Sequence, residues 1–280
     1  FLSIQKEGPR RRGARRDAFQ NNRKRSERNE PQSPPPSFPF PQNYAILNPD
    51  TPKKKNGGTR LTQGYPKAER LATGLGLAVV GGFLDTYTYF TRGGVFANAQ
   101  TGNLVLLGIS AARGELYRAG QYLIPVLAFA LGVVATEGLR ARRGAGDWQR
   151  TVLLLEAAIL TVVGLLPPAF PDFVVNVTVS FLCSMQVNSF RLLEGMPYAT
   201  TMCTGNLRSC AYHLGQRLFA GERAGTGRAA RYLWVMLAFC AGAALGVPAT
   251  QWAGGRAVWL CVLPLLLVRA WLGYQYEYRS

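Results

Sequence analysis

The stretch YLIPVLAFALG, residues 122–132, recurs as YLWVMLAFCAG at residues 232–242, with identity at six of eleven positions. A second block, Thr-Gly-Asn-Leu, occupies residues 101–104 and returns at residues 204–207. The two pairs occur in the same order, at offsets of 110 and 103 residues. Since self-similarity of this kind indicates repeated structural units, we predict an internal duplication. In many membrane transport proteins such halves face each other across a pseudo-two-fold axis, with the working site between them.

Apolar runs around these blocks are long enough to cross a bilayer, whose hydrocarbon core takes about 20 helical residues. Six runs qualify or nearly qualify: residues 71–90, 122–139, 151–170, 173–190, 232–252 and 257–274. Two further segments, residues 95–111 and 199–218, are shorter or more polar, and each contains one Thr-Gly-Asn block. We therefore predict an all-α, polytopic integral membrane protein with six spans plus two re-entrant or broken half-helices. The repeats are expected at about residues 70–170 and 173–274.

Arginine positions favour six spans over eight. With six spans, one arginine cluster lies in the cytoplasm together with both termini: Arg140, Arg142, Arg143, Arg150 and Arg191. Eight spans would move this cluster outside, against the bias of basic residues toward cytoplasmic loops. Three spans per repeat is an odd number, so the two halves are expected to have inverted topology. We predict a multi-pass inner-membrane protein with both termini cytoplasmic, and eight spans stay the alternative.

The N-terminal region, residues 1–66, differs from the membrane domain expected at residues 67–280. Residues 1–70 hold 16 of the 32 lysines and arginines, and the proline-rich stretch PPPSFPFP occupies residues 34–41. Because this region has no apolar period to offset the cost of chain ordering, we expect it to be disordered. The alternatives are a basic arm for anionic lipid or nucleic acid, and a gene start placed too far upstream, since the chain begins with Phe1.

The two Thr-Gly-Asn blocks supply most of the candidate binding residues: Thr101, Gly102, Asn103, Thr204, Gly205 and Asn206, with Asn98 just ahead of the first block. Broken backbone inside a membrane needs polar groups around it, so these turns should line a cavity. Glycine permits unusual backbone angles, and a helix N-terminus carries a partial positive charge that suits an anion or a polar oxygen. The alternative is that threonine and asparagine cap and pack two short helices around a solid core.

Asp85 is a further candidate, because it lies fourteen residues after Leu71, about 20 Å into the first span at helical rise. A carboxylate at that depth is costly without a partner or a proton, which marks it as a functional candidate. Its repeat partner is Asn188, and Arg208 could neutralise it or attract an anionic solute. A salt bridge from Asp85 to Arg92 or Arg208 is the structural alternative.

The remaining acidic and reactive residues form no catalytic constellation. Glu137 and Glu156 are expected to pair with Arg140 or Arg150. The single histidine rules out multi-histidine metal sites, and the five cysteines have no CxxC spacing. We predict a protein that is not an enzyme and needs no metal or cofactor.

These features favour a transporter or channel for a small polar or anionic solute, with its site at the repeat interface. A non-transporting membrane scaffold or sensor is the alternative, and a membrane-embedded enzyme that uses Asp85 is the third hypothesis. The expected partners are the lipid bilayer and an unidentified solute. A homo-oligomer is left open, and no nucleic-acid partner is expected.

Three motifs carry a resemblance to a known family. They are GGFLD at residues 81–85, GGVFANAQTGN at residues 93–103 and ATTMCTGNLR at residues 199–208. With both Thr-Gly-Asn blocks in order, residues from about 70 to 274 resemble the YoaK-type membrane proteins, a family of unknown function (DUF1275, UPF0700-like). The resemblance implies an integral, multi-spanning bacterial inner-membrane protein. It supplies no substrate, reaction or site.

Overall fold

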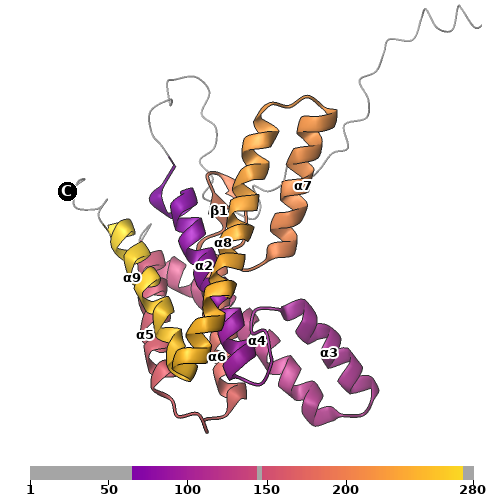
Figure 1. Cartoon of the computed structure of the whole chain (residues 1–280), viewed down its shortest axis with the longest axis vertical. Helices are drawn as coiled ribbons and strands as arrows, with labels where there is room; N and C mark the ends of the chain where they lie inside the picture. The colour runs from indigo at the N-terminus through magenta and orange to yellow at the C-terminus, as the bar shows by residue number, and fades with distance from the viewer. Residues whose placement is uncertain (1–64, 144–146, 274–280) are drawn as a thin grey trace, which may run out of the picture. The chain divides into compact units, whose positions relative to one another are not determined.

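The computed structural model describes residues 65–143 and 147–273, so nearly all of the N-terminal region predicted to be disordered lies outside the described residues. Helices dominate the described chain (Figure 1), and one short antiparallel hairpin interrupts them. The elements are η2 (Lys67–Glu69), α2 (Leu71–Thr91), α3 (Gln100–Ala112), α4 (Leu116–Arg142), α5 (Asp147–Leu165), α6 (Asp172–Ser189), β1 (Leu192–Leu193), β2 (Met196–Pro197), α7 (Cys203–Phe219), α8 (Ala224–Ala253), η3 (Gly254–Val258) and α9 (Trp259–Gly273).

Each of the six apolar runs in the sequence forms one helix, namely α2, α4, α5, α6, α8 or α9. The two shorter segments form α3 and α7, and each of these helices begins one residue before its Thr-Gly-Asn block. The blocks therefore occupy the first helical turns. The non-helical backbone lies just ahead of them, in the links from α2 to α3 and from α6 to α7.

Three stretches of the described chain are long and apolar enough to cross a membrane: Leu116–Arg142, Asp147–Leu165 and Ala224–Gly273. The last of these contains both α8 and α9. By contrast, α2 and α6 carry many polar residues, and most of these are buried. The helices that hydropathy identifies most readily, such as α4, expose leucine and valine on their outer faces. This arrangement, with polar side chains inside and apolar side chains outside, is typical of a helical bundle in lipid.

The helices pack in a crossed pattern rather than with their sequence neighbours alone. The principal contacts join α2 to α8, α4 to α6 and α5 to α9, whereas α3 lies along α4 and α7 lies along α8 (Figure 1). The largest core cluster contains buried apolar residues of α2, α5, α6 and α9. The segments from the two predicted repeats are therefore interleaved in the bundle.

Glycines allow the closest helix crossings. A Cβ atom at Gly82 of α2 would overlap the carbonyl oxygen of Phe239 in α8, and a Cβ at Gly242 of α8 would overlap the carbonyl oxygen of Val79 in α2. At Gly132 of α4, a Cβ would overlap the Ser184 side chain of α6. Small residues at such positions let helix backbones approach each other and increase their van der Waals contact. This contact matters in a membrane, because apolar lipid tails leave no hydrophobic effect to drive helices together.

Candidate functional site

Asp85 fixes the link between α2 and α3 to the body of α2. The backbone N–H of Asn98 donates to Asp85 Oδ1 at 3.2 Å, and the N–H of Ala97 donates to Thr88 Oγ1 at 3.4 Å. The link turns at Gly93 and Gly94, whose φ angles of +78° and +72° favour glycine. Side chains in the last two turns of α2 thus accept hydrogen bonds from backbone N–H groups that lie outside any helix.

A group of polar side chains surrounds this link. Asn98 is buried, and its amide lies beside both the Asp85 carboxylate and the Cys183 thiol of α6. Asp85 and Asn98, both predicted site residues, therefore come together. We call Asp85, Asn98, Cys183 and Glu156 the central polar cluster.

Glu156 of α5 is the member that sequence reasoning misplaced. It is 1% exposed, it lies near Cys183 and Cys261, and neither of its carboxyl oxygens has a hydrogen-bond partner in the described part of the chain. The predicted pairing of Glu156 with Arg140 or Arg150 is therefore wrong. The signal was present in the sequence LLLEAAIL, residues 153–160, where apolar residues occupy every helical face around the acid.

Both arginines have other acidic partners. Arg150 Nη1 lies 3.7 Å from Asp147 Oδ1 in the first turn of α5. Arg140 Nη1 lies 3.5 Å from Glu137 Oε2, so the predicted pairing of Glu137 with Arg140 is confirmed.

Arg92 also has a partner other than the one proposed as the structural alternative. Its side chain is 2% exposed, and its Nη1 lies 3.5 Å from Asp172 Oδ1 at the start of α6. Asn176 Nδ2 donates to the Arg92 carbonyl oxygen at 3.0 Å. Arg92 therefore anchors the end of α2 to α6, and its acidic partner is Asp172 rather than Asp85.

Asn103, in the first Thr-Gly-Asn block, belongs to a chain of polar contacts between α3, α6 and α4. Asn103 Nδ2 donates to Gln100 Oε1 at 3.2 Å, and Gln100 Nε2 donates to Ser180 Oγ at 2.8 Å. Ser180 Oγ in turn donates to the carbonyl oxygen of Pro125 at 2.9 Å. This chain holds the first turn of α3 against the bundle.

Asn206, in the second block, has a different role. Its side chain is 2% exposed and makes two hydrogen bonds with one backbone unit: Nδ2 donates to the Ala199 carbonyl oxygen at 2.7 Å, and the Ala199 N–H donates to Oδ1 at 3.2 Å. Asn206 thereby closes the loop that precedes α7. Four other predicted residues of the blocks are exposed, as is Arg208 just after the second block: Thr101, Gly102, Thr204 and Gly205.

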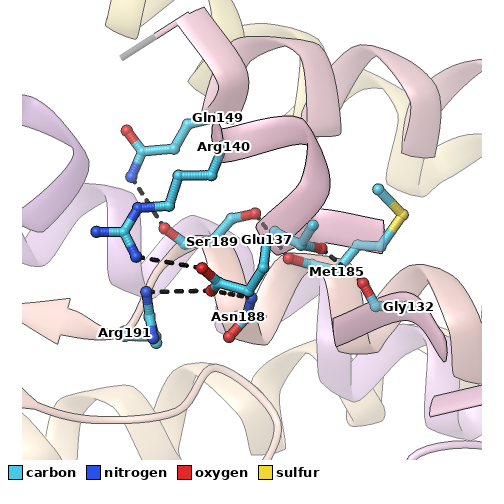
Figure 2. Close-up of polar contacts among 9 residues, drawn as sticks. Gly132, Glu137, Arg140, Gln149, Met185, Asn188, Ser189 and Arg191 are labelled. Carbon is cyan, nitrogen blue, oxygen red and sulfur yellow. Dashed lines mark hydrogen bonds and ion pairs between the residues drawn. The ribbon is translucent and has the colours of Figure 1, made fainter. Parts of the chain in front are cut away.

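Asn188, the predicted repeat partner of Asp85, lies in a separate ionic cluster (Figure 2). Asn188 Nδ2 donates to Glu137 Oε1 at 2.8 Å, and Arg191 Nη2 lies 3.4 Å from the same oxygen. Arg140 binds the other carboxylate oxygen of Glu137 (Figure 2). The cluster ties the end of α6 to α4, so Asp85 and its predicted counterpart Asn188 make different contacts.

A cavity shared by Asp85 and both Thr-Gly-Asn blocks stays a prediction. In Figure 1, α3 lies beside α4 and α7 lies beside α8, so the two blocks belong to different helix pairs. Two cavities described in the structure lie elsewhere. One is a groove among α4, α5 and α9, and the other is a small apolar hollow between α5 and α9.

Apolar helices with exposed leucine faces, around helices with buried polar side chains, define a multi-pass helical membrane protein. The chain belongs to the family described as "Protein of unknown function (DUF1275)", which matches residues 73–271. It is similar to the UPF0700 transmembrane protein YoaK of Bacillus subtilis (strain 168), with 28% identity over 149 residues. The match covers 51% of this chain and 66% of that protein. No solved structure matches this chain. The family predicted from the three motifs is thus confirmed.

Proposed function

We propose that this protein is a transporter or channel for a small polar or anionic solute, with its site at the interface between two inverted halves. The observation that carries the proposal is the hydrogen bond from the Asn98 backbone to Asp85, because it places a carboxylate beside interrupted backbone within a bundle of membrane helices. Interrupted helices at membrane depth are where secondary transporters bind solutes and coupling ions.

The helix packing supports an inverted duplication. If α2 to α5 correspond in order to α6 to α9, then the α2–α8 and α4–α6 contacts are equivalent, as are the α3–α4 and α7–α8 contacts. The α5–α9 contact is then equivalent to itself across the axis. Gly132 and Gly242, equivalent at the 110-residue offset, each permit one of the two tight crossings.

The proposed topology has six spans and two short helices, α3 and α7, that do not cross. Three spans in each half give the halves opposite orientations, which is the arrangement expected for an alternating-access protein. Both termini and the arginines near Arg142 are then cytoplasmic, and the membrane is the bacterial inner membrane.

The second candidate function is a non-transporting membrane scaffold or sensor. The observation that favours it is the internal satisfaction of Asn188 and Asn206, whose amides bind Glu137 and Ala199 rather than pointing into open space. Such bonds rigidify a packed centre. A scaffold would have no solute that stabilises the fold.

A thermal-shift screen of the purified protein against small polar and anionic metabolites separates these functions. A solute that binds only the folded state raises the unfolding temperature, and the stabilisation grows with the logarithm of one plus the ratio of solute concentration to Kd. We expect Asp85→Asn to abolish this shift with little change in the stability of the solute-free protein.

Asp172→Asn is the matched control, because it alters an acid that pairs with Arg92 outside the central polar cluster. It should lower stability and leave the solute-dependent shift in place. If no solute shifts the wild-type protein and proteoliposomes show no uptake, the scaffold is favoured.

A further inference from the structure

An arginine-lined groove lies at one end of the bundle, away from the central polar cluster. It has a volume of about 690 Å³ and opens between the end of α4, the first turns of α5 and the end of α9. Its polar wall contains Arg143, Asp147, Arg150, Thr151 and Arg269. The groove has no part in the proposed solute site.

Positive charge exceeds negative charge in this groove. Arg150 pairs with Asp147 at 3.7 Å, and Arg143 Nη1 donates to Thr151 Oγ1 at 2.8 Å. The structure gives Arg269 no ion pair within the described residues. The Nε atoms of Arg150 and Arg269 are buried and have no hydrogen-bond partner there. Three guanidinium groups therefore face one carboxylate, and two of them have unused donors.

The guanidinium of Arg150 is held against the end of α9. A Cβ atom at Gly273 would lie 3.0 Å from Arg150 Nη2, so this glycine leaves just enough space for the arginine. Arginine presents a planar set of donors that matches the oxygens of a phosphate group. Arg150 of α5 and Arg269 of α9 both line the groove, so it offers two such sets of donors.

One turn further along α5 from Arg150 and Thr151, the lining of the groove is apolar. Leu154 and Leu155 line it, and they are 45% and 41% exposed. Both belong to the apolar stretch Asp147–Leu165, whereas the arginines lie at or near the ends of the apolar stretches. The cationic end of the groove thus lies where the membrane surface is expected, and its apolar end lies toward the hydrocarbon core.

We propose that this groove binds the phosphate head group of an anionic phospholipid. The arginines would bind the phosphodiester oxygens, and an acyl chain would lie along Leu154 and Leu155. Basic pockets between membrane helices are known to bind anionic lipid head groups. A free phosphate ion has the same charged oxygens, but it has no apolar part that could contact the exposed leucines, so the observations favour the lipid.

The test is native mass spectrometry of the full chain in detergent, with phosphatidylglycerol, phosphatidylcholine or inorganic phosphate added separately. We expect retention of phosphatidylglycerol over phosphatidylcholine and no retention of inorganic phosphate. Arg150→Gln and Arg269→Gln should each weaken phosphatidylglycerol binding about fivefold, the equivalent of about 1 kcal/mol per basic residue near an anionic surface. Arg269→Lys should keep part of the binding, because it keeps the charge and loses the fork of donors.

Arg113→Gln is the matched control, since Arg113 is an exposed arginine at the end of α3, outside the groove. It should leave lipid binding unchanged. Equal loss in Arg113→Gln would assign the binding to general surface charge and overturn the proposal. Unchanged binding in both groove variants would also overturn it, as would retention of inorganic phosphate without lipid. Melting curves in phosphatidylcholine alone identify a variant that fails to fold. In that case the phosphatidylglycerol binding of Arg269→Lys is compared with that of the wild-type protein.

Discussion

Replacing Gly242 with alanine perturbs the tightest crossing in the bundle. The new Cβ atom would overlap the carbonyl oxygen and carbonyl carbon of Val79, which are backbone atoms of α2. A flexible side chain could rotate away, but a helical carbonyl cannot. The two helices must therefore separate, and the neighbouring close contact of Gly246 with Thr86 would loosen with them.

The expected cost is the difference between two opposing effects. Overpacking in a tightly packed interior costs about 1–3 kcal/mol, and a backbone obstacle places Gly242→Ala near the upper limit. Alanine in a helix gains about 0.5–1 kcal/mol over glycine. The net loss is therefore about 2 kcal/mol, which corresponds to roughly 4–8 °C in the melting temperature of a domain of this size.

Thermal unfolding of the purified protein in one detergent measures this loss. Gly138→Ala is the matched control, because a Cβ at Gly138 of α4 has no atom within 4 Å. It should gain stability from helix propensity alone. A Gly242→Ala protein as stable as Gly138→Ala would show that α2 and α8 do not cross this closely.

Three further outcomes are expected. Asn206→Ala should lower the free energy of unfolding by about 2 kcal/mol, because it removes two hydrogen bonds to Ala199 at about 1 kcal/mol each. The control is Ser209→Ala, which removes an exposed hydrogen bond to Gly205 and should have little effect in the same melting assay. Burial raises the pKa of Glu69 above its usual 4.5, against a smaller opposing effect of the Gly195 backbone N–H, so the folded chain holds this proton more tightly than the unfolded chain. The contribution of this proton to stability is complete below the unfolded-state pKa and is lost as pH rises through the folded-state pKa. Glu69→Gln should therefore flatten the fall in melting temperature above pH 4.5. An unaltered slope would contradict this. The topology can be tested with single cysteines at Ala141 and Ala253, in a background without the five native cysteines. The proposed six-span arrangement places these positions on opposite sides of the membrane, so they should react with an impermeant reagent from opposite sides. Labelling from the same side would support eight spans.

The helices themselves were predictable from the sequence, because about 20 apolar residues are needed to cross the hydrocarbon and such runs have visible limits. All six runs form helices whose bounds lie within a few residues of those expected, apart from the longer starts of α4 and α8. Asp85 was also identifiable, since depth along a span follows directly from helical rise. Its contact with Asn98 brings together two residues of the predicted site.

Side-chain partners were harder to predict, because sequence gives depth along a helix but not the direction in which the helix turns each side chain within the bundle. Glu156 and Arg150 lie on the same helix, yet Glu156 belongs to the central polar cluster and Arg150 lines the groove. Asp172, which binds Arg92, becomes its neighbour only once α2 and α6 are packed. Pairing rules based on proximity in sequence therefore succeeded for Glu137 with Arg140 and failed for Glu156.

The distribution of polarity explains why hydropathy identifies only part of this bundle. A helix that faces lipid must be apolar, but a helix surrounded by other helices can carry polar side chains that bind one another and the backbone. In α6, Ser180 binds the Pro125 carbonyl oxygen and Gln186 binds the Leu77 carbonyl oxygen, so two polar residues join α6 to α4 and α2. The polar side chains that lower the hydropathy of α6 are thus the ones that hold it at the centre of the bundle.

Glu156 is the exception, because its carboxyl oxygens have no such bond among the described residues. An acid without a partner at this depth is costly to retain for packing alone. Together with Asp85, it gives the proposed solute site two carboxyl groups, both close to Cys183.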